Sequence, residues 1–374
     1  MTEDMIARHD RATTQAIDST VQAISARAVR VPVVAPMQTA AGEAHTMPLV
    51  LIDLTTSAGT TGRAYLIAYT PLVLTPLTLL VSELGQAIIG TPAAPVDVDA
   101  DLRSRLRLLR PQGLATMAIS GIDIALWDAL AKAVRLPLAH LLGGGRHAVP
   151  AYASLKSMHP SAAGDEATGL AAHGFGAYKI KLSLGDLRDD LRVVRAVRAA
   201  VGDQAQLALD YNQSLSVPQA IHRIRALAQE TPLWIEEPTR AEDFAGHARI
   251  RERVPVPIQI GESWWSTDDM AESIAAGASD YAMPDVTRIG GVTGWLRAAA
   301  LGDAAGLPIS SHLLPQVNVH LLAVSPGAHL LEFLDLAAPV LQEPATVVDG
   351  VMAVPDTPGI GIDWDEEAVA RYAA

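Results

Sequence analysis

The sequence predicts an α/β protein in which a parallel (β/α) barrel follows a smaller α+β domain. The chain has 374 residues, which suits a barrel of about 200–250 residues plus a second domain. From residue 149 onward, short apolar runs typical of buried strands alternate with helical patterns. Three successive runs carry an acid at or next to their end, and these acids, Asp210, Glu236 and Glu262, are spaced evenly, since 236 − 210 and 262 − 236 are both 26. That interval is about the length of one strand–loop–helix–loop unit.

Residues 1–145 are predicted to form the α+β domain. The segments VRVPVV and PLVLIDLTTSAGTTGRAYLIAYT alternate in polarity and turn at Gly59 and Gly62, which indicates an antiparallel meander. Residues 64–82 are uncharged and about as long as a membrane span. Because prolines and threonines divide this stretch, we interpret it as a strand, a Thr-Pro helix start and a core helix. Helical spacing predicts a further helix over 114–138.

Residues 146–336 are predicted to form the barrel. Eight strand-like runs follow one another in the order PAYAS, AYKIKLS, QLALD, LWIEE, PIQIGE, DYAMPD, PISSH and HLLEFLD. Helical patterns such as DLRDDLRVVRAVRAAVG lie between them. Strands that run in one direction with short loops favour a closed barrel over an open sheet. The GGVTG run at 290–294 has the wrong spacing for a nucleotide-binding loop and is expected to open a helix tightly.

Two further segments complete this organisation. The tail, residues 337–374, contains Pro-Gly turns and is expected to pack back on the first domain. The segment PMQTAAGEAH lies between the first strands and is small and glycine-containing. It is either a mobile lid over a site or a surface turn.

The three evenly spaced acids predict a metal site. In a parallel barrel every strand end points to the same face, so Asp210, Glu236 and Glu262 converge although they are far apart in sequence. Converging carboxylates repel one another and are costly to ionise together without a cation. Oxygen ligands alone favour a hard cation, first Mg²⁺ and second Mn²⁺. Glu237 follows Glu236 directly, so strand alternation turns it away, and we assign Glu236 to the metal.

Two lysines lie on the strand before the first acid. Lys179 and Lys181 are two residues apart, so both point to one face, and the alternation directs them inward with the acids. Two close ammonium groups lower each other's pKa, which is one way to obtain a lysine base near neutral pH. The alternative is a solvated pair whose heads reach out from a strand end.

The last strands supply a histidine and two acids. Asp285 and His312 end adjacent predicted strands, and an aspartate on the far nitrogen of a histidine fixes its tautomer and raises its basicity. A lone histidine is more often structural, but this one lies among other strand-end candidates. Glu332 is the acid of an apolar run, where a desolvated carboxyl would stay protonated and donate to an oxyanion. The alternative for Glu332 is a capping or surface acid.

Composition excludes several classes of function. The chain carries 28 basic and 41 acidic residues, a formal charge of −13, and no basic run, which argues against nucleic acid and anionic membranes as partners. Zero cysteines exclude disulfides, thiolate metal sites and cysteine nucleophiles. The N-terminal segment MTEDMIARHDRATT lacks the apolar core of a signal peptide, so we expect a cytoplasmic protein.

Several motifs together resemble those of the enolase superfamily, and within it the mandelate racemase subgroup. They are KIK, DYNQSLSVP, WIEEPT, GES, MPDVTRIGGVTGW, SSHL and LLEFLDLA. The resemblance runs nearly from end to end of the chain. It implies an N-terminal capping domain, a modified (β/α)₇β barrel, and a homo-oligomer for which an octamer is plausible.

The resemblance also implies roles for individual residues. The three acids would bind Mg²⁺, and the substrate would be a small carboxylate. Lys181 would be the base on one face of that substrate, and the His312–Asp285 dyad would act on the other face. The residues implied in contacts to the substrate are Lys179, Glu332, Ser154 and Asn212. Removing a proton α to a carboxylate forms a dianion, which the cation, Lys179 and a neutral Glu332 would stabilise.

The chain departs from the subgroup pattern around the substrate. Arg288 stands where a lysine is expected, Gln38 where a histidine is expected, and Leu314-Pro315-Gln316 replaces Phe-Gln-Glu. These changes concern the lid and the seventh loop, so they affect substrate identity rather than chemistry.

Three functional classes follow. The first is a racemase of an aryl or otherwise apolar 2-hydroxy acid, favoured by the apolar region 64–74 with Met37. The second is a sugar-acid dehydratase, in which His312 would protonate a leaving hydroxyl and Gln38 and Tyr69 would contact a polyol. The third is a non-catalytic metal-binding protein, which is disfavoured because inward charges cost stability without a reaction to serve.

Overall fold

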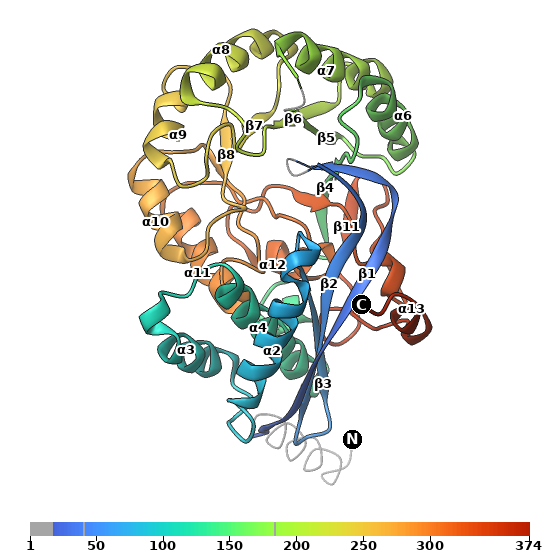
Figure 1. Ribbon diagram of the computed structural model, residues 1–374, viewed down its shortest axis with the longest axis vertical. Coiled ribbons are helices and arrows are strands. Elements are labelled where there is room, and N and C mark those ends of the chain that lie inside the picture. Colours follow the sequence, from blue (N-terminus) through green and yellow to red (C-terminus); the bar gives the residue numbers. More distant parts are fainter. Residues whose placement is uncertain (1–17, 40–41, 183–184) are drawn as a thin grey trace.

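The computed structural model describes residues 18–39, 42–182 and 185–374 (Figure 1). An antiparallel sheet with its helices forms one end of the molecule, and a curled parallel sheet with helices on its outer side forms the other. The segment 1–14, on which the expectation of a cytoplasmic protein rests, lies outside the described residues. Residues 40 and 41 of the predicted lid and residues 183 and 184 after the KIK strand lie outside them as well.

The capping domain is the predicted meander followed by helices. Its strands pair antiparallel in the order β1-β2-β3. The elements are β1 (Val21–Thr39), β2 (Gly42–Thr56), β3 (Thr61–Ile67), η1 (Pro71–Val73), α2 (Leu74–Gln86), α3 (Pro95–Arg105), η2 (Arg107–Leu109), α4 (Leu114–Ala133) and α5 (Leu138–Leu141). The long β1–β2 hairpin reaches toward the barrel in Figure 1, and its tip is the segment predicted as a lid or surface turn.

The prediction of turns at both Gly59 and Gly62 is wrong for the second glycine. Gly59 lies in the β2–β3 turn with φ +77°, a conformation that glycine adopts without steric cost. Gly62 lies inside β3, where an added Cβ would sit 1.9 Å from the Ala125 carbonyl oxygen of α4. Glycine is required there because strand and helix backbones come close together.

The uncharged stretch 64–82 is divided as predicted. It contains the end of β3, a helical turn with Thr70 as N-cap and Pro71 at its first position, and most of α2. By length and composition alone, one described helix, α4, is long and apolar enough to cross a membrane, and 78% of its apolar window is buried in the protein. The helix expected over 114–138 ends at Ala133, since Arg135 adopts φ +59° and Pro137 bars continuation.

The barrel strands occur where the sequence predicts them, with one exception. They are β4 (Ala148–Ser154), β5 (Ala177–Lys181), β6 (Gln206–Asp210), β7 (Trp234–Glu236), β8 (Ile258–Ile260), β9 (Tyr281–Ala282) and β10 (Leu331–Phe333). They pair in parallel in the order β10-β4-β5-β6-β7-β8-β9. The predicted strand PISSH forms isolated bridges only. Ile309 bridges both Ala282 and Ala328, and so this segment closes the ring between β9 and β10.

Helices cover the outside of the ring (Figure 1). They are α6 (Pro160–Ala171), α7 (Leu187–Val201), α8 (Val217–Leu227), η3 (Ala228–Glu230), α9 (Phe244–Arg251), α10 (Thr267–Ala275), α11 (Gly291–Ala304) and α12 (Pro315–Val324). The GGVTG run opens α11 tightly, as predicted, with φ +68° at Gly291. A Cβ on Gly291 would meet the Asp123 carboxylate of α4 at 2.3 Å, and Asp123 accepts hydrogen bonds from the Thr293 amide and hydroxyl.

The C-terminal segment contacts the barrel first and the capping domain afterwards. It contains η4 (Ala338–Val340), β11 (Val351–Ala353) and α13 (Glu366–Arg371). Strand β11 pairs antiparallel with β4 of the barrel, a pairing that the sequence did not indicate. Beyond it, the Arg30 amide donates to the Tyr372 carbonyl at 2.8 Å and the Ala374 amide to the Ala28 carbonyl at 3.0 Å. The tail therefore returns to β1, as expected.

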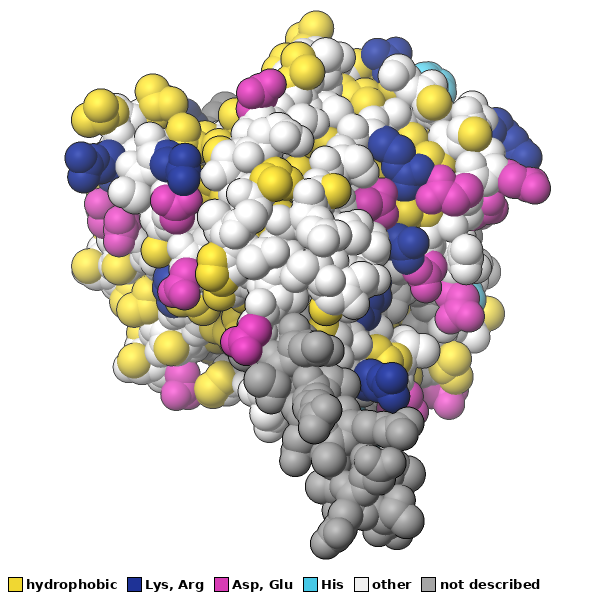
Figure 2. Space-filling model, turned by 90° about the horizontal axis from the view of Figure 1, so that it is seen from below, with side chains coloured by type: hydrophobic (Ala, Val, Ile, Leu, Met, Phe, Trp, Pro, Cys, Tyr) yellow, Lys and Arg dark blue, Asp and Glu magenta, His cyan; other side chains and the backbone are white. Residues whose placement is uncertain are grey.

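The face seen in Figure 2 carries mixed charges. Basic and acidic side chains are interspersed there among apolar ones, and the described residues form no basic patch on that face. The expectation that the protein does not bind nucleic acid stays a prediction.

The contact between β3 and α4 gives a prediction about stability. Gly62→Ala should lower the melting temperature, because overpacking against backbone costs about 1–3 kcal/mol. Gly169 is the matched control, since it is exposed on α6 with no atom within 4 Å of an added Cβ. Gly169→Ala should raise stability by about 0.5–1 kcal/mol through helix propensity. Thermal unfolding followed by circular dichroism measures both variants. An unchanged melting temperature for Gly62→Ala would contradict the close packing of the β3 and α4 backbones.

Candidate metal centre and active site

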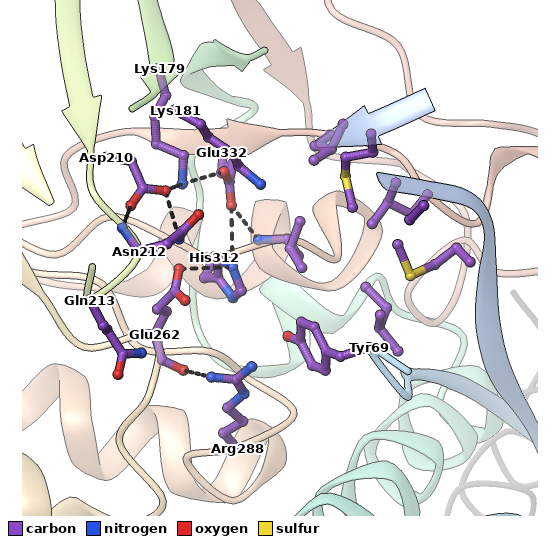
Figure 3. Close-up of a pocket in the computed structure, with 17 residues that line it drawn as sticks. Tyr69, Lys179, Lys181, Asp210, Asn212, Gln213, Glu262, Arg288, His312 and Glu332 are labelled. Carbon is purple, nitrogen blue, oxygen red and sulfur yellow. Dashed lines mark hydrogen bonds and ion pairs between the residues drawn. The ribbon is translucent and has the colours of Figure 1, made fainter. Parts of the chain in front are cut away.

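A cavity of about 280 Å³ opens at the carboxyl ends of the barrel strands, beneath the capping domain (Figure 3). Its barrel side is polar and charged, and is lined by Lys179, Lys181, Asp210, Asn212, Gln213, Glu262, Arg288, His312 and Glu332. Tyr69 and an apolar wall complete it, the wall being formed by Met37, Ala44, Met47, Ile67, Leu313, Leu334 and Leu336. The capping domain therefore supplies part of the apolar lining, and the barrel supplies the ionisable groups.

The three acids from successive strands come together at this end of the barrel. One carboxylate oxygen of each of Asp210, Glu236 and Glu262 lies within 4.8 Å of the others, and all three residues are buried. Asp210 and Glu236 are the last residues of β6 and β7 and are paired in register. Glu262 follows β8 after Gly261, whose φ is +135°. Within the described residues, no other group of three or more potential ligands meets the same test.

The donor set of these acids fits Mg²⁺. Burial and mutual repulsion raise the pKa of Glu236 to about 8 despite nearby Lys179, and burial raises the pKa of Asp210. A cation placed between the carboxylates removes this penalty. Because all the ligand atoms are oxygens, a hard ion is preferred, with Mn²⁺ as the second choice.

Lys179 is surrounded by carboxylates rather than by another lysine. Its Nζ lies 2.7 Å from Glu236 Oε1, 2.7 Å from Glu332 Oε1 and 3.7 Å from Asp210 Oδ2. Burial lowers its pKa, but the carboxylates outweigh burial and raise that pKa well above the usual value. The hypothesis that the two lysines lower each other's pKa is therefore wrong for Lys179, which is a fixed ammonium.

Lys181 has a different environment, although strand alternation puts it on the same face. It is half-buried, lines the cavity, and pairs in register with Asp210. Its ammonium makes no ion pair within 4.0 Å with any described residue, in contrast to Lys179. This lysine is therefore the one available to a molecule in the cavity (Figure 3).

The predicted dyad is formed. His312 Nδ1 and Asp285 Oδ2 are 2.7 Å apart, and Asp285 Oδ1 accepts from the Thr287 amide at 2.6 Å and hydroxyl at 2.7 Å. Burial raises the pKa of Asp285, but these donors, His312 first, lower it to about 2. Burial lowers the pKa of His312, but Glu262, 3.2 Å from Nε2, and Asp285 raise it above its usual value.

The structure contradicts the expectation of a protonated Glu332. Its carboxylate receives the Lys179 ammonium on Oε1 and the Leu313 amide on Oε2 at 2.8 Å. Burial alone would raise its pKa, but the charges of Lys179 and His312 outweigh burial and lower the pKa to about 2. The prediction rested on the apolar neighbours of Glu332 in the sequence. In the structure its side chain faces Lys179, which lies two strands away on β5. Glu332 is therefore ionised in the free protein.

The remaining predicted contacts differ in how they meet the cavity. Asn212 lines it and donates to Asp210 Oδ2 at 3.1 Å. Ser154 does not line the cavity but pairs in register with Lys179, which does, and its buried hydroxyl has no hydrogen-bond partner among the described residues. Gln38 pairs with Glu43 in the β1–β2 hairpin, and its side chain lies outside what the structure describes.

Tyr69 connects the capping domain to the dyad. Its hydroxyl donates to Asp285 Oδ2 at 2.8 Å, the same oxygen that faces His312. Its backbone has φ +59°, a left-handed conformation that costs a non-glycine residue about 1–3 kcal/mol and persists where the surroundings enforce it. The Arg288 guanidinium stacks on the Tyr69 ring at 4.5 Å. The position of this tyrosine is therefore fixed from both sides.

Sequence reasoning missed several lining residues. Gln213 donates to Glu237 at 2.8 Å and to Ser263 at 3.1 Å. Arg288, which the sequence marked only as a departure from the family pattern, donates to the Glu262 carbonyl at 2.9 Å. The position of Gln213 directly after DYN was the available signal. The apolar lining by Leu334 and Leu336 follows the last strand, and no pattern in the sequence marked it.

Comparison with known proteins defines the class. Residues 15–143 match the mandelate racemase / muconate lactonizing enzyme N-terminal domain, and residues 162–368 match the enolase C-terminal domain-like family. The chain thus belongs to the enolase superfamily, in the mandelate racemase and muconate lactonizing enzyme group. Solved structures similar to it contain magnesium, and the protein is a Mg²⁺-dependent enzyme with the modified barrel of this superfamily.

Individual relatives differ in the activity they are named for. The chain is 33% identical to a 3,6-anhydro-α-L-galactonate cycloisomerase of Streptomyces coelicolor, over 87% of this chain and 91% of that one. It is 34% identical to an L-talarate/galactarate dehydratase of Salmonella typhimurium, over 68% and 65%. A solved enolase from Bradyrhizobium, complexed with magnesium and mandelic acid, is 44% identical and superposes with a TM-score of 0.91 over 96% of this chain and 99% of that one.

The acid cluster predicts how the metal-free protein behaves. Mg²⁺ should raise the melting temperature, because it relieves repulsion among buried carboxylates. Asp210→Asn should lose most of this rise, whereas Asp101→Asn, which changes an exposed acid paired with Arg105, should keep it. EDTA should abolish turnover reversibly. Full activity after thorough chelation, or a Mg²⁺ response unaffected by Asp210→Asn, would contradict the assignment.

Proposed function

We propose that this enzyme racemises a 2-hydroxy acid with an aryl or other apolar substituent. The observation that carries the proposal is the position of two candidate bases at one cavity. Lys181 ends β5, His312 ends the segment that closes the ring, and β10 and β4 lie between them. A substrate between the two side chains would have one base on each face, so a proton removed from one side would return on the other.

The chain's own residues divide the remaining tasks. Asp210, Glu236 and Glu262 would hold Mg²⁺, which would supply positive charge to stabilise the negative charge that develops when the α-proton is removed. Lys179 holds a permanent ammonium next to that carboxylate and balances the developing negative charge. Asp285 keeps the proton of His312 on Nδ1, so that Nε2 faces the substrate. The unpaired Ser154 hydroxyl and the Asn212 amide are the proposed further donors to the substrate.

Glu332 needs a different role from the one its sequence suggested. It is ionised in the free protein because Lys179 and the Leu313 amide bind it. An anionic substrate that approaches Lys179 would compete for the same ammonium and raise the pKa of Glu332. We therefore propose that substrate binding is accompanied by proton uptake at this carboxyl.

A sugar-acid dehydratase is the alternative, and the named dehydratase relative supports it. The same enolate would expel a 3-hydroxyl if His312 protonated it. The apolar wall favours the racemase. Its members include Met37, Met47 and Ile67, whereas a polyol would need hydrogen-bonding groups along its length. Contacts of Gln38 and Tyr69 to the substrate remain part of either proposal.

We also propose that the enzyme is a cytoplasmic homo-oligomer, with an octamer as one form. The proposal rests on the family and on the 49% hydrophobic composition of the chain. Light scattering coupled to size exclusion measures the mass directly. A single species at the chain mass of 39.4 kDa would refute it.

The two-base arrangement predicts asymmetric variants. In D₂O with Mg²⁺, His312→Asn should still exchange the α-proton of the enantiomer that faces Lys181, without inverting it. Lys181→Ala should exchange only the opposite enantiomer. Each variant should lose racemisation by a factor of at least about 10³, since general-base catalysis contributes typically 10²–10⁴-fold. Proton NMR and chiral chromatography follow exchange and inversion separately.

The exposed His222 provides the control, since His222→Asn should leave exchange unchanged. Loss of exchange for both enantiomers in each single variant would contradict the hypothesis that Lys181 and His312 act as bases on opposite faces of the substrate. Loss of water from a sugar acid, detected as a mass decrease of the product, would instead favour the dehydratase.

A further inference from the structure

The inner layer of the barrel directly beneath the metal ligands contains hydrogen-bond donors aimed at one of them. Trp234 precedes Glu236 by two residues on β7, so both side chains point inward. The indole Nε1 donates to Glu236 Oε2 at 3.1 Å. The Gln259 amide on neighbouring β8 lies 3.4 Å from the same oxygen. All three side chains are fully buried.

The other oxygen of this carboxylate faces a different group. Glu236 Oε1 lies 2.7 Å from Lys179 Nζ, which in turn lies beside Asp210. One oxygen is therefore turned to the barrel interior, and the other is turned to the ionisable cluster. The indole itself is immobilised, since its ring contacts Tyr152 edge-on at a centroid distance of 5.5 Å and His329 at 5.8 Å.

Gln259 indicates that this layer serves the ligand and does not merely fill space. Barrel interiors are usually packed with branched apolar side chains, and an apolar residue would fill the same volume without polar atoms. The Gln259 Oε1 atom is buried with no hydrogen-bond partner among the described residues, a cost of about 1–3 kcal/mol. Its Nε2 atom is directed at Glu236 and at the Met283 sulfur, 3.1 Å away.

We propose that Trp234 and Gln259 are positioning residues that hold Oε2 of Glu236 toward the barrel interior. Only Oε1 of this carboxylate is then available to bind the metal. A carboxylate that can use only one oxygen suits Mg²⁺, which takes six ligands in a strict octahedron. It disfavours Ca²⁺, which takes six to eight ligands and often binds carboxylates through both oxygens. The pair therefore contributes to affinity for Mg²⁺ and to its selection over Ca²⁺. This inference depends on the metal site but not on racemisation.

The test is calorimetric titration of the full-length, metal-free protein with Mg²⁺ and, separately, with Ca²⁺. Trp234→Phe removes the indole N–H and keeps an aromatic ring. It should weaken Mg²⁺ binding about 10–100-fold, the usual effect of losing a group that orients a metal ligand. Binding of Ca²⁺ should fall less or rise, so the ratio of the two affinities should shrink. Gln259→Met, a near-isosteric change without the amide, should act in the same direction with a smaller effect.

Trp295→Phe is the matched control. Trp295 is also fully buried, and its indole donates to the Ser325 hydroxyl at 3.0 Å on another part of the barrel. This variant should show the same general loss of packing and unchanged affinities for both ions. If Trp234→Phe does not fold, Gln259→Met still decides the question. Unchanged Mg²⁺ affinity in a folded variant would overturn the proposal, and equal losses for the two ions would overturn the single-oxygen role.

Discussion

The site depends on a cluster of buried carboxylates gathered around one ammonium. Lys179 lies 2.7 Å from both Glu236 and Glu332 and 3.7 Å from Asp210. Desolvating each such charge costs several kcal/mol, and removing one partner of a buried pair costs roughly 3–5 kcal/mol. Burial raises the pKa values of Asp210 and Glu236, and the single ammonium of Lys179 does not offset this effect. The buried acids therefore lack enough positive charge, and a divalent cation would supply it. Affinity for the metal thus follows from the way the barrel gathers these carboxylates.

Segments far apart in the sequence enforce this arrangement from outside the ring. The C-terminal segment pairs β11 with β4 and then binds β1 through its last residues, while Asp123 of α4 caps the start of α11. Tyr69 extends from the end of β3 to Asp285. Together these contacts join the capping domain to the barrel. They therefore fix the apolar wall of the cavity relative to the charged residues on its barrel side.

Sequence periodicity predicted where the acids, the lysines and the dyad meet, because strand ends of a parallel barrel share one face. It could not predict their charge states. Lys179 was expected to have a depressed pKa from Lys181, and Glu332 was expected to stay protonated, yet the two residues form an ion pair. That pairing depends on β10 and β5 flanking β4, a closure of the ring that no local pattern encodes. For the same reason the sequence predicts a turn at Gly62, which lies in β3, because the helix that packs against it is more than sixty residues away.

The apolar wall of the cavity distinguishes racemisation from dehydration, because both reactions need the same charged residues on the barrel side. A phenyl group buried against Met37, Met47 and Ile67 gains roughly 2–3 kcal/mol. Each sugar hydroxyl left unpaired there would instead cost about 1–3 kcal/mol. Two polar side chains of the cavity are already engaged, since the Tyr69 hydroxyl donates to Asp285 and the Gln213 amide donates to Glu237 and Ser263. A polyol would have to break those bonds to be held, whereas an apolar 2-hydroxy acid leaves them intact.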